Sequence, residues 1–432
     1  MTVGFFTLGC KVNQVDSQTL AQWLVNAGYT RAEPEIADVV VINSCTVTAE
    51  SERKTRQRLR HFRVLNRNCI LVITGCAVQV GDDTALRYPE ADLILGQQDA
   101  RDLLHYIDKF LLNRQQIISI SARQRDEAID TLSYESDIRT RATIKIEDGC
   151  DSFCSYCIIP HARGPVRSKP LADLRKEIKT LADQGFREVV LAGINLGAYG
   201  SDLGYHLSDA VLTTAEAVEG TPLQRIRLGS LEPDCMTDSL LETLSCVKSL
   251  CPHFHLSLQS GCDHTLKRMN RQYSTKEYFS IVNRLRTHFP DAAITTDIMV
   301  GFPGESDEEF SQSLAFAEQI GFANMHVFPF SPRQGTPAAS FAGQITKTEK
   351  KKRATQMLLL AQTMRHNFLN SQIGKTLEVL LEEPFSGGGM QGYSANYTPI
   401  IISDANPQQQ NQLVLAQITV VNENHCIGLL TH

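Results

Sequence analysis

The stretch EDGCDSFCSYC, residues 147–157, places three cysteines in one short loop. Cys150 follows a run of strand-forming residues, and Cys154 and Cys157 come four and three positions later. Short spacings of this kind let successive thiolates bind different iron atoms of one 4Fe–4S cluster. Three thiolates leave the fourth iron open to a small molecule with an amine and a carboxylate, such as S-adenosylmethionine (SAM).

A zinc site is the alternative for this loop. His161 lies four residues after Cys157, so a site made of three cysteines and one histidine is formally possible. Structural zinc sites usually combine two such loops, and no second loop of this kind appears, since Cys246 and Cys251 form no recognisable ligand pattern. The iron–sulfur interpretation is therefore favoured over zinc.

The loop belongs to a segment that repeats a strand and a helix six times, and each strand ends in a polar or glycine-rich loop. Such repeats predict an incomplete version of the eight-unit βα barrel, with its site at the C-terminal strand ends. A doubly wound open sheet is the alternative. The predicted strands cover residues 142–150, 188–195, 225–233, 254–261, 293–305 and 323–330.

The N-terminal segment contains three near-continuous apolar runs, VGFFTLGC (3–10), ADVVVINSC (37–45) and CILVITGC (69–76). Helical patterns lie between them. Continuous apolar strands suit a parallel sheet that is covered on both faces. The segment is therefore predicted to form a Rossmann-like α/β domain.

Each of these three runs ends in a cysteine, at Cys10, Cys45 and Cys76. Parallel strands place their C-terminal ends on one edge of a sheet, so the three thiols are expected to meet there. The helices that follow would point their positive N-terminal ends at the same place, which favours an anionic cluster. A second three-thiolate site is predicted, whereas Cys69 begins its strand and points away.

The C-terminal segment changes pattern. A helix is predicted over residues 346–371, and short alternating runs separated by turn residues then predict a small antiparallel β-barrel. The predicted organisation is a cluster domain over 1–115, a linker over 116–138, a part-barrel over 139–345, the helical connector over 346–371 and the barrel over 372–432.

Composition indicates an ordinary globular protein of 432 residues, with 42% hydrophobic and 21% charged residues and a net charge of −6. No apolar run approaches the ~18 residues of a membrane span, and the N-terminus lacks the basic region of a signal peptide. We expect a cytoplasmic protein with no membrane partner. Its 12 cysteines are then expected to be buried, catalytic or metal-bound rather than disulfide-bonded.

Several motifs resemble those of the radical SAM methylthiotransferases. They include LGCKVNQVDS (8–17), INSCTVTAESERKTRQ (42–57), the cysteine loop with the following IIPHARGPVRS, HLSLQSG (255–261) and FSPRQGTPAA (330–339). That family has an N-terminal cluster domain, a radical SAM part-barrel and a C-terminal β-barrel called TRAM. GCKVNQ and ARGPVRS are most similar to the branch that acts on N6-threonylcarbamoyladenosine in tRNA.

The resemblance implies methylthiolation of carbon 2 of that nucleoside at tRNA position 37, with SAM and two 4Fe–4S clusters. Carbon 2 has a strong, non-acidic C–H bond, so a radical route is needed. The nearest alternatives are the same chemistry on N6-isopentenyladenosine or on a ribosomal-protein aspartate. A nucleic-acid-binding module with structural zinc is the alternative from a different class. A flavodoxin- or ferredoxin-like electron donor and an unidentified sulfur source are further expected partners.

Polar residues at the part-barrel's strand ends are candidate SAM contacts, and ordinary loop capping is the alternative role for each. The resemblance also implies that Tyr156 lies beside the adenine of SAM. The candidate set is Tyr156, Asn195, Glu232, Gln259, Ser260 and Asp297.

Basic residues after Cys45 are candidate tRNA contacts. Five arginines recur every three or four positions, which predicts one cationic stripe on a helix that a phosphate backbone would neutralise. A solvated surface helix is the alternative. Two further arginines near the cysteine loop were assigned to phosphate or to the threonyl carboxylate. The set is Arg53, Arg56, Arg60, Arg63 and Arg67, with Arg163 and Arg167.

The C-terminal segment departs from the expectation for a TRAM domain, because Lys375 is its one basic residue of the Lys or Arg type. Electrostatic capture of RNA by this barrel is therefore doubtful. Three alternatives follow: the barrel recognises shape or bases, docks another part of the enzyme, or has lost the RNA-binding role. Its acidic residues are Glu378, Glu382, Glu383, Asp404 and Glu423.

Overall fold

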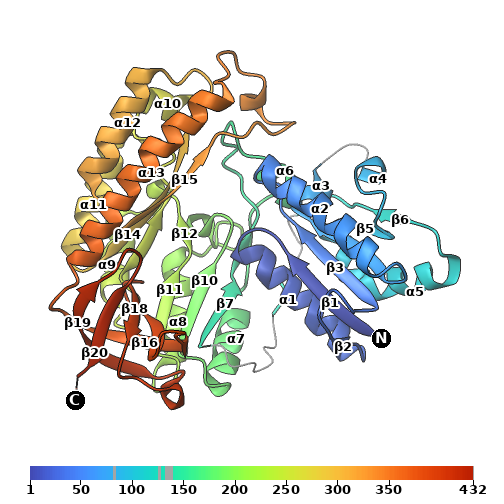
Figure 1. The fold of residues 1–432 in the computed structure, drawn as a ribbon, viewed down its shortest axis with the longest axis horizontal. Coiled ribbons are helices and arrows are strands. Elements are labelled where there is room, and N and C mark those ends of the chain that lie inside the picture. Colours follow the sequence, from blue (N-terminus) through green and yellow to red (C-terminus); the bar gives the residue numbers. More distant parts are fainter. Residues whose placement is uncertain (81–83, 125–127, 132–139, 432) are drawn as a thin grey trace.

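The computed structural model describes residues 1–80, 84–124, 128–131 and 140–431. Parts of the predicted linker over 116–138 therefore lie outside the described residues. Figure 1 shows an N-terminal α/β domain beside a curved array of strands and helices, and a small C-terminal barrel below that array. None of the described helices has the length and apolarity to cross a membrane.

The N-terminal domain is a parallel sheet of six described strands in the order β2-β1-β3-β4-β5-β6. Its strands are β1 (Thr2–Thr7), β2 (Thr30–Arg31), β3 (Val39–Ser44), β4 (Ile70–Gly75), β5 (Leu93–Leu95) and β6 (Ile117–Ser119). Its helices are α1 (Lys11–Asn26), α2 (Ala49–Leu65), α3 (Cys76–Gln79), α4 (Thr84–Arg87) and α5 (Leu103–Asn113). The strand order reverses direction between β1 and β3, where ligands bind in open α/β sheets.

Helices cover both faces of this sheet, which explains the continuous apolar runs. Leu24 of α1 and Phe110 of α5 pack with Val41 on one face. Phe62 of α2 packs with Ile42 on the other face. All these side chains are buried, so the predicted Rossmann-like domain is confirmed in its fold class.

The second domain is a parallel array in which β7-β10-β11 continues into β12-β13-β14-β15. Its strands are β7 (Arg141–Lys145), β10 (Glu188–Ala192), β11 (Arg225–Leu228), β12 (Ser230–Leu231), β13 (His253–Leu256), β14 (Ala293–Val300) and β15 (Asn324–Pro329), with a small antiparallel pair formed by β8 (Glu147–Asp148) and β9 (Arg167–Ser168). Its helices are α6 (Ile159–Arg163), α7 (Leu171–Asp183), α8 (Leu207–Val218), α9 (Asp238–Ser245), α10 (Asp263–Arg268), α11 (Thr275–His288) and α12 (Asp307–Ile320).

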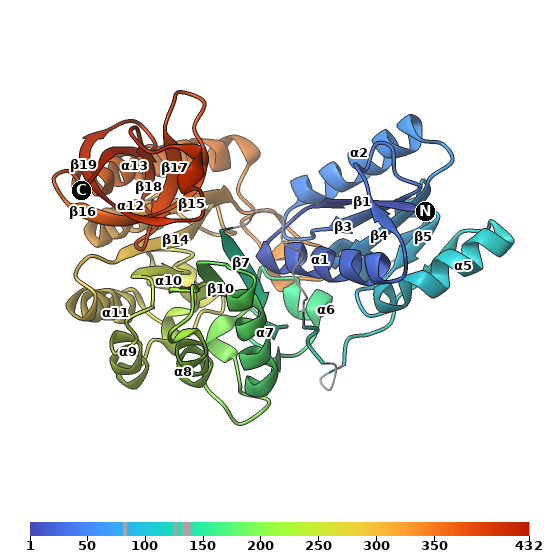
Figure 2. The same cartoon turned by 90° about the horizontal axis from the view of Figure 1, so that it is seen from below.

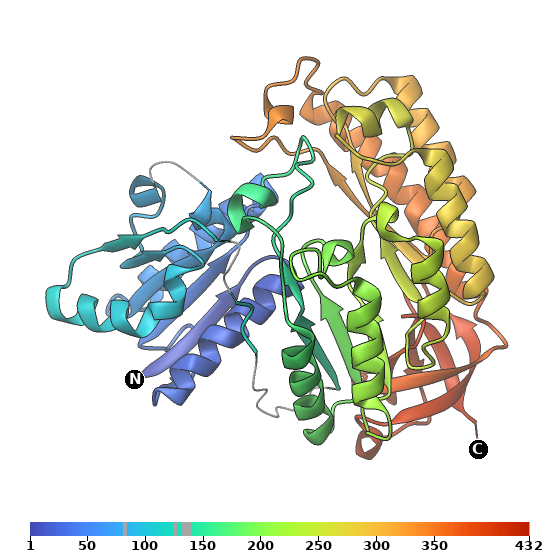
Figure 3. The same cartoon turned by 180° about the vertical axis from the view of Figure 1, so that it is seen from behind.

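This order follows the chain without reversing, so the right-handed crossover helices all lie on one side of the array. Figure 3 shows these helices along the outer, convex face. A doubly wound sheet would have helices on both faces. The part-barrel is therefore confirmed over the open-sheet alternative, and its C-terminal strand ends face the N-terminal domain (Figure 1).

The long helix α13 (Lys347–Asn370) packs along β15 and leads into the C-terminal barrel. The barrel closes in the order β16-β17-β18-β20-β19, with β16 (Thr376–Pro384), β17 (Met390–Ser394), β18 (Pro399–Ile402), β19 (Leu413–Val421) and β20 (Cys426–Leu430). The barrel is confirmed, but one feature of the prediction is wrong. The β18–β20 pair is parallel, because the chain crosses the barrel end before it closes the sheet.

Acidic residues of the barrel dock it onto the part-barrel. Glu382 is 2.5 Å from the guanidinium of Arg141, the first residue of β7. Glu378 is 2.9 Å from that of Arg225, the first residue of β11. The barrel thus lies at the N-terminal strand ends, and Figure 2 places it at the end of the molecule opposite the N-terminal domain. These ion pairs account for part of its acidic composition.

Candidate cluster sites and the cavity between them

The three strand-end cysteines of the first domain meet at one edge of the sheet. Cys10 caps α1, and its thiol lies 3.7 Å from Oδ1 of Asn13. The thiol of Cys76, at the start of α3, lies 3.9 Å from the same oxygen. A Cβ placed on Gly9 would be 3.1 Å from Cβ of Cys45. The side chain of Asn13 and the turn before Cys10 thus gather all three cysteines, as the parallel topology requires.

The environment of these thiols suits a metal cluster. Cys45 and Cys76 are buried, whereas Cys10 is exposed at the mouth of the site. Burial raises the pKa of the Cys76 thiol to about 12 and also raises the pKa of Cys45. Such thiols stay protonated unless a cation replaces the protons, and three soft sulfur donors in one place fit an iron–sulfur cluster.

The second trio lies directly after β8. The backbone N–H of Cys157 donates to the carbonyl of Cys154 at 2.9 Å, which closes the loop. Gly149 has φ +94°, and a Cβ there would lie 2.0 Å from the carbonyl oxygen of Pro165, so only glycine fits before Cys150. Burial, together with the neighbouring thiols, raises the pKa of Cys157 to about 12. The donor set again fits a cluster.

A cation that the sequence analysis missed lies at this second site. Arg271 donates from Nη1 to the sulfur of Cys154 at 3.3 Å and forms an ion pair with Glu232. Burial raises the pKa of Glu232, although Arg271 opposes this effect. Arg271 lies in the turn after α10, where no local pattern distinguishes it from other surface arginines. Its role follows only from the folded chain.

One buried side chain connects the two sites. Helix α6 begins two residues after Cys157, packs against α3 and ends at Arg163. The Nη2 atom of Arg163 donates to Oδ1 of Asn13 at 2.6 Å and lies 2.9 Å from Asp16. Its Nη1 atom lies 2.9 Å from Asp148, two residues before Cys150. Arg163 therefore contacts the supports of both cysteine trios at once.

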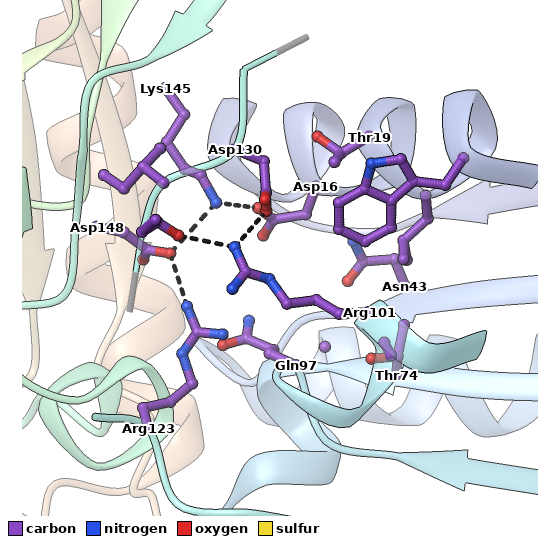
Figure 4. Close-up of a pocket in the computed structure, with 16 residues that line it drawn as sticks. Asp16, Thr19, Asn43, Thr74, Gln97, Arg101, Arg123, Asp130, Lys145 and Asp148 are labelled. Carbon is purple, nitrogen blue, oxygen red and sulfur yellow. Dashed lines mark hydrogen bonds and ion pairs between the residues drawn. The ribbon is translucent and has the colours of Figure 1, made fainter. Parts of the chain in front are cut away.

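A charge network continues from this arginine along the domain interface (Figure 4). Lys145 of β7 bridges Asp16 at 2.5 Å and Asp148 at 3.3 Å, and Arg123 reaches Asp148 at 3.4 Å. Burial disfavours the ionised form of Asp148, but the surrounding cations outweigh it and hold the pKa of this carboxyl well below its usual range. A cavity of about 40 Å³ remains among these groups, so the network joins the domains rather than holding a large ligand.

A larger cavity of about 170 Å³ lies between the loops that carry Cys45 and Cys157. Val47 and Thr48 line it from the first domain, and apolar groups of the part-barrel line it from the second. The loop after β15 holds the two walls together. Ser331 accepts a hydrogen bond from the backbone N–H of Ala49 at 3.2 Å, and Arg333 donates to Thr46 at 2.8 Å. Cys157 of the second trio thus lines this interdomain cavity, and Val47, two residues after Cys45, lines it from the first domain.

Three of the predicted SAM contacts line this cavity, namely Tyr156, Gln259 and Asp297. The ring of Tyr156 meets Phe302 edge-on at 6.5 Å. Gln259 has φ +66°, and its side-chain Oε1 is buried without a hydrogen-bond partner among the described residues. A buried, unpaired acceptor that lines a cavity is the group expected to bind a ligand.

The other predicted SAM contacts lie elsewhere. Asn195 is beside the cysteine loop, with Nδ2 3.4 Å from the hydroxyl of Ser152, and Glu232 pairs with Arg271. Ser260 is buried and accepts from the backbone N–H of Cys262 at 3.3 Å. This hydrogen bond is the one expected from the capping alternative, and the assignment of Ser260 as a SAM contact stays a prediction.

Two histidines flank Asp297 on the concave face of the part-barrel. Nδ1 of His326 is 3.1 Å from one carboxylate oxygen, and Nε2 of His255 is 3.3 Å from the other. Burial would raise the pKa of Asp297, but these two hydrogen bonds hold it well below its usual range. The sequence analysis missed both histidines. The register of the strands could have identified them, because Asp297 lies opposite His326 on β15, and Thr295 lies opposite His255 on β13.

The predicted arginine stripe on α2 is not a free cationic surface. Four of its members form ion pairs with carboxylates of the first domain, so no external anion is needed to offset their repulsion. The helix ends at Leu65, which leaves Arg67 outside it. The pairs are Arg53 with Glu50 at 2.5 Å, Arg56 with Glu52 at 3.0 Å, Arg60 with Glu90 at 2.9 Å and Arg63 with Asp92 at 2.6 Å.

The assignment of Arg163 and Arg167 to a phosphate or a threonyl carboxylate also needs correction. Both side chains are fully buried. Arg163 is occupied by Asn13 and Asp148, and Arg167 donates to the backbone carbonyls of Arg163 and Pro165 at 3.0 and 3.2 Å. Neither guanidinium faces a surface that RNA could reach.

Comparisons with known proteins agree with this architecture. The family model "Uncharacterized protein family UPF0004" matches residues 2–96, and "Radical SAM superfamily" matches residues 144–317. Two similar relatives are named "Threonylcarbamoyladenosine tRNA methylthiotransferase MtaB". The one from Thermotoga maritima is 38% identical over 92% of this chain and 90% of its own length. The one from Bacillus subtilis is 36% identical over 93% and 90%.

A relative from Pelotomaculum thermopropionicum, named "tRNA-2-methylthio-N(6)-dimethylallyladenosine synthase", is 33% identical over 98% of this chain and 96% of its own length. Among solved structures, the radical SAM methyltransferase TsrM from Kitasatospora setae superposes with a TM-score of 0.57. That match covers 78% of this chain and 77% of the other, at 13% identity. An identity this low supports the shared fold alone.

Proposed function

The chain belongs to the radical SAM methylthiotransferase family, in the branch of its MtaB relatives, and from this premise we propose that it methylthiolates carbon 2 of N6-threonylcarbamoyladenosine at position 37 of tRNA. It is a transferase that acts on tRNA and uses SAM and 4Fe–4S chemistry. The identity of the modified adenosine is the part of this function that we propose. The observation that carries it is the 34–38% identity to relatives named for this nucleoside, against 32–33% to relatives named as dimethylallyladenosine synthases.

Two clusters are part of the proposal. Cys10, Cys45 and Cys76 would hold one of them. Cys150, Cys154 and Cys157 would hold the other. The gathering of each trio supports this assignment, as does the interdomain cavity, which Cys157 lines opposite Val47 and Thr48. When bound, the cluster on Cys150, Cys154 and Cys157 would supply one-electron reduction of SAM, and the cluster on Cys10, Cys45 and Cys76 would hold the sulfur to be transferred.

The chain's own residues position and shield the reactants. Met299, Phe328 and Phe330 form apolar walls of the cavity, which exclude water from a reactive radical. Gln259 and Asp297 supply polar groups on the same cavity. Arg271 donates to Cys154, and a hydrogen bond to a ligating sulfur tunes the reduction potential of a cluster. Tyr156, which lines the same cavity, would pack beside SAM.

Nucleoside mass spectrometry tests the substrate. tRNA from a strain that lacks the gene should retain threonylcarbamoyladenosine and lose its methylthio derivative, and the wild-type gene should restore it. A gene carrying Cys10→Ala should not restore it. Loss of methylthio-isopentenyladenosine with intact methylthio-threonylcarbamoyladenosine would assign the enzyme to the other branch.

Iron analysis tests the two clusters. Anaerobically reconstituted wild-type protein should hold about eight irons per chain, since each cluster contains four. A Cys150→Ala/Cys154→Ala/Cys157→Ala variant should retain about four, held by the first trio. A variant without iron would remove the first-domain cluster from the proposal.

A further inference from the structure

A groove of about 740 Å³ lies on the first domain between β1 and α2. Phe6 and Leu8 line it from the β1 side, and Lys54, Arg58 and His61 line it from α2. It exists because α2 packs over β3 and β4, whereas β1 is flanked on its other side only by the two-residue strand β2. This α2 groove is separate from the cavity between the cysteine trios.

Lys54, Arg58 and the paired Arg60 make the α2 side of the groove basic, and Gln57 and His61 complete it. Lys54, Arg58 and His61 follow a spacing of four and three, which puts them on one face of the helix. No carboxylate of the described residues forms an ion pair with Arg58, whose exposed guanidinium lies 4.8 Å from the ring centroid of Phe6. Lys54 reaches Glu50 only at 4.0 Å, because Glu50 is held more closely by Arg53.

The groove also lies close to the proposed reaction centre. On the β1 side, the lining residues Phe6 and Leu8 precede Cys10 by four and two positions in the sequence. Helix α2, which carries the other wall, begins after its Thr48 cap, and Thr48 lines the interdomain cavity three residues after Cys45. From Thr48 to Arg58 the helix rises about 15 Å. A chain that placed one nucleotide in the cavity would therefore pass the groove within a few nucleotides.

We propose that the α2 groove binds the sugar–phosphate backbone of the tRNA strand next to the modified adenosine, with Arg58 and Lys54 on phosphates. This inference deepens the proposed function and rests on it. A guanidinium stacked on an aromatic ring in a basic groove is the arrangement that holds single-stranded nucleic acid. Contacts to phosphates carry no sequence information, so the choice of base depends on the residues of the cavity.

Matched arginine variants on one helix test the proposal. Arg58→Ala removes a groove cation, and Arg53→Ala removes an equally charged, exposed arginine that is paired with Glu50. The probe is a fluorescent anticodon stem–loop RNA that carries threonylcarbamoyladenosine, followed by anisotropy over a series of salt concentrations. Arg58→Ala should weaken binding by roughly three- to tenfold. It should also reduce the slope of log Kd against log salt concentration by about one. Arg53→Ala should bind within about twofold of wild type.

Iron content and thermal melting of each variant show whether it is folded and loaded. Equal RNA affinity for Arg58→Ala, Lys54→Ala and wild type would overturn the proposal. So would unchanged RNA affinity with slower reduction by flavodoxin, since the groove would then dock an acidic electron donor. If wild-type protein fails to bind this RNA but binds the isopentenyladenosine form, the substrate assignment fails. The groove proposal is then tested by measuring how tightly the same variants bind the isopentenyladenosine RNA.

Discussion

Arg163 donates from Nη2 to the side-chain oxygen of Asn13 at 2.6 Å, although 150 positions separate the two residues in sequence. Asn13 contacts the thiols of Cys10 and Cys76, and Arg163 ends the helix that follows Cys157. The contact therefore couples the position of one cysteine trio to that of the other. Two sites on different domains need such a fixed separation if one nucleotide is to meet both.

Replacing Arg163 should be costly for stability. Arg163→Gln would remove one of the two cations that Asp16 and Asp148 share, leaving Lys145 as the other, and breaking a buried ion pair typically costs 3–5 kcal/mol. We expect the free energy of unfolding of the iron-free, reduced chain to fall by roughly this amount in denaturant titrations. Arg101→Gln is the control, because its pair with Asp130 is partly exposed and is expected to contribute less than about 1 kcal/mol. Equal losses for both variants would contradict the bridging role.

Arg271 should matter for the second cluster rather than for folding alone. Arg271→Gln removes the donor to Cys154, and loss of such a supporting group typically lowers activity or metal affinity by about 10–100-fold. Reductive cleavage of SAM by the reconstituted enzyme is expected to fall by that factor. Arg268→Gln, nearby in the chain but paired with Glu309, is the control. A normal cleavage rate and iron content in Arg271→Gln would disprove the assignment.

His326 should titrate above its ordinary range. Its hydrogen bond to Asp297 raises the pKa of the imidazole, although partial burial opposes the shift. The pair is therefore at full strength below about pH 6.5, the usual histidine pKa, and weakens as the pH rises through the raised value. NMR of ¹⁵N-histidine-labelled protein follows the titration, with His326→Gln to assign the signal. Asp297→Asn should lower the pKa of His326, and an unchanged titration would contradict the pairing.

Tyr397 should anchor the C-terminal barrel. Its ring stacks on Tyr393 at 4.7 Å and lies 4.6 Å from the guanidinium of Arg227 in the part-barrel. An aromatic pair and a cation–π contact are each worth about 0.5–2 kcal/mol. Tyr397→Ala is therefore expected to destabilise the chain by about 1–3 kcal/mol and to speed proteolysis after α13. The exposed Tyr205→Ala is the control, and equal proteolysis of both variants would argue against docking through Tyr397.

Local spacing was enough to predict the cysteine trios as groups. Cys150, Cys154 and Cys157 lie within one loop, so their proximity follows from chain length alone. The meeting of Cys10, Cys45 and Cys76 needed one further step. Parallel strands share an edge for their C-terminal ends, and each cysteine follows directly on a strand. The strand–helix repeat predicted the part-barrel in the same way, because sequential right-handed crossovers leave few other topologies.

The charged residues behaved differently. The spacing of Arg53, Arg56, Arg60 and Arg63 correctly indicates one face of a helix, but Glu90 and Asp92, the partners of the last two, come from a segment some 30 residues away. The sequence pattern could not show that Arg58, on the adjacent face, would form no ion pair with any carboxylate of the described residues. The partner of a charged side chain depends on which elements meet in space, not on the spacing of the charges along the helix.

The sequence by itself determined the two cysteine trios, the three kinds of domain and the polar strand ends, because these follow from spacings and strand direction within single elements. Only the tertiary structure decided that Arg163 joins the two trios, that Arg271 meets Cys154 and that the barrel's acids dock on Arg141 and Arg225. The physical reason is the separation along the chain of the residues that each kind of constraint connects. Backbone geometry restricts neighbours along the chain, whereas an ion pair or a hydrogen bond forms wherever packing brings the two groups within a few ångströms.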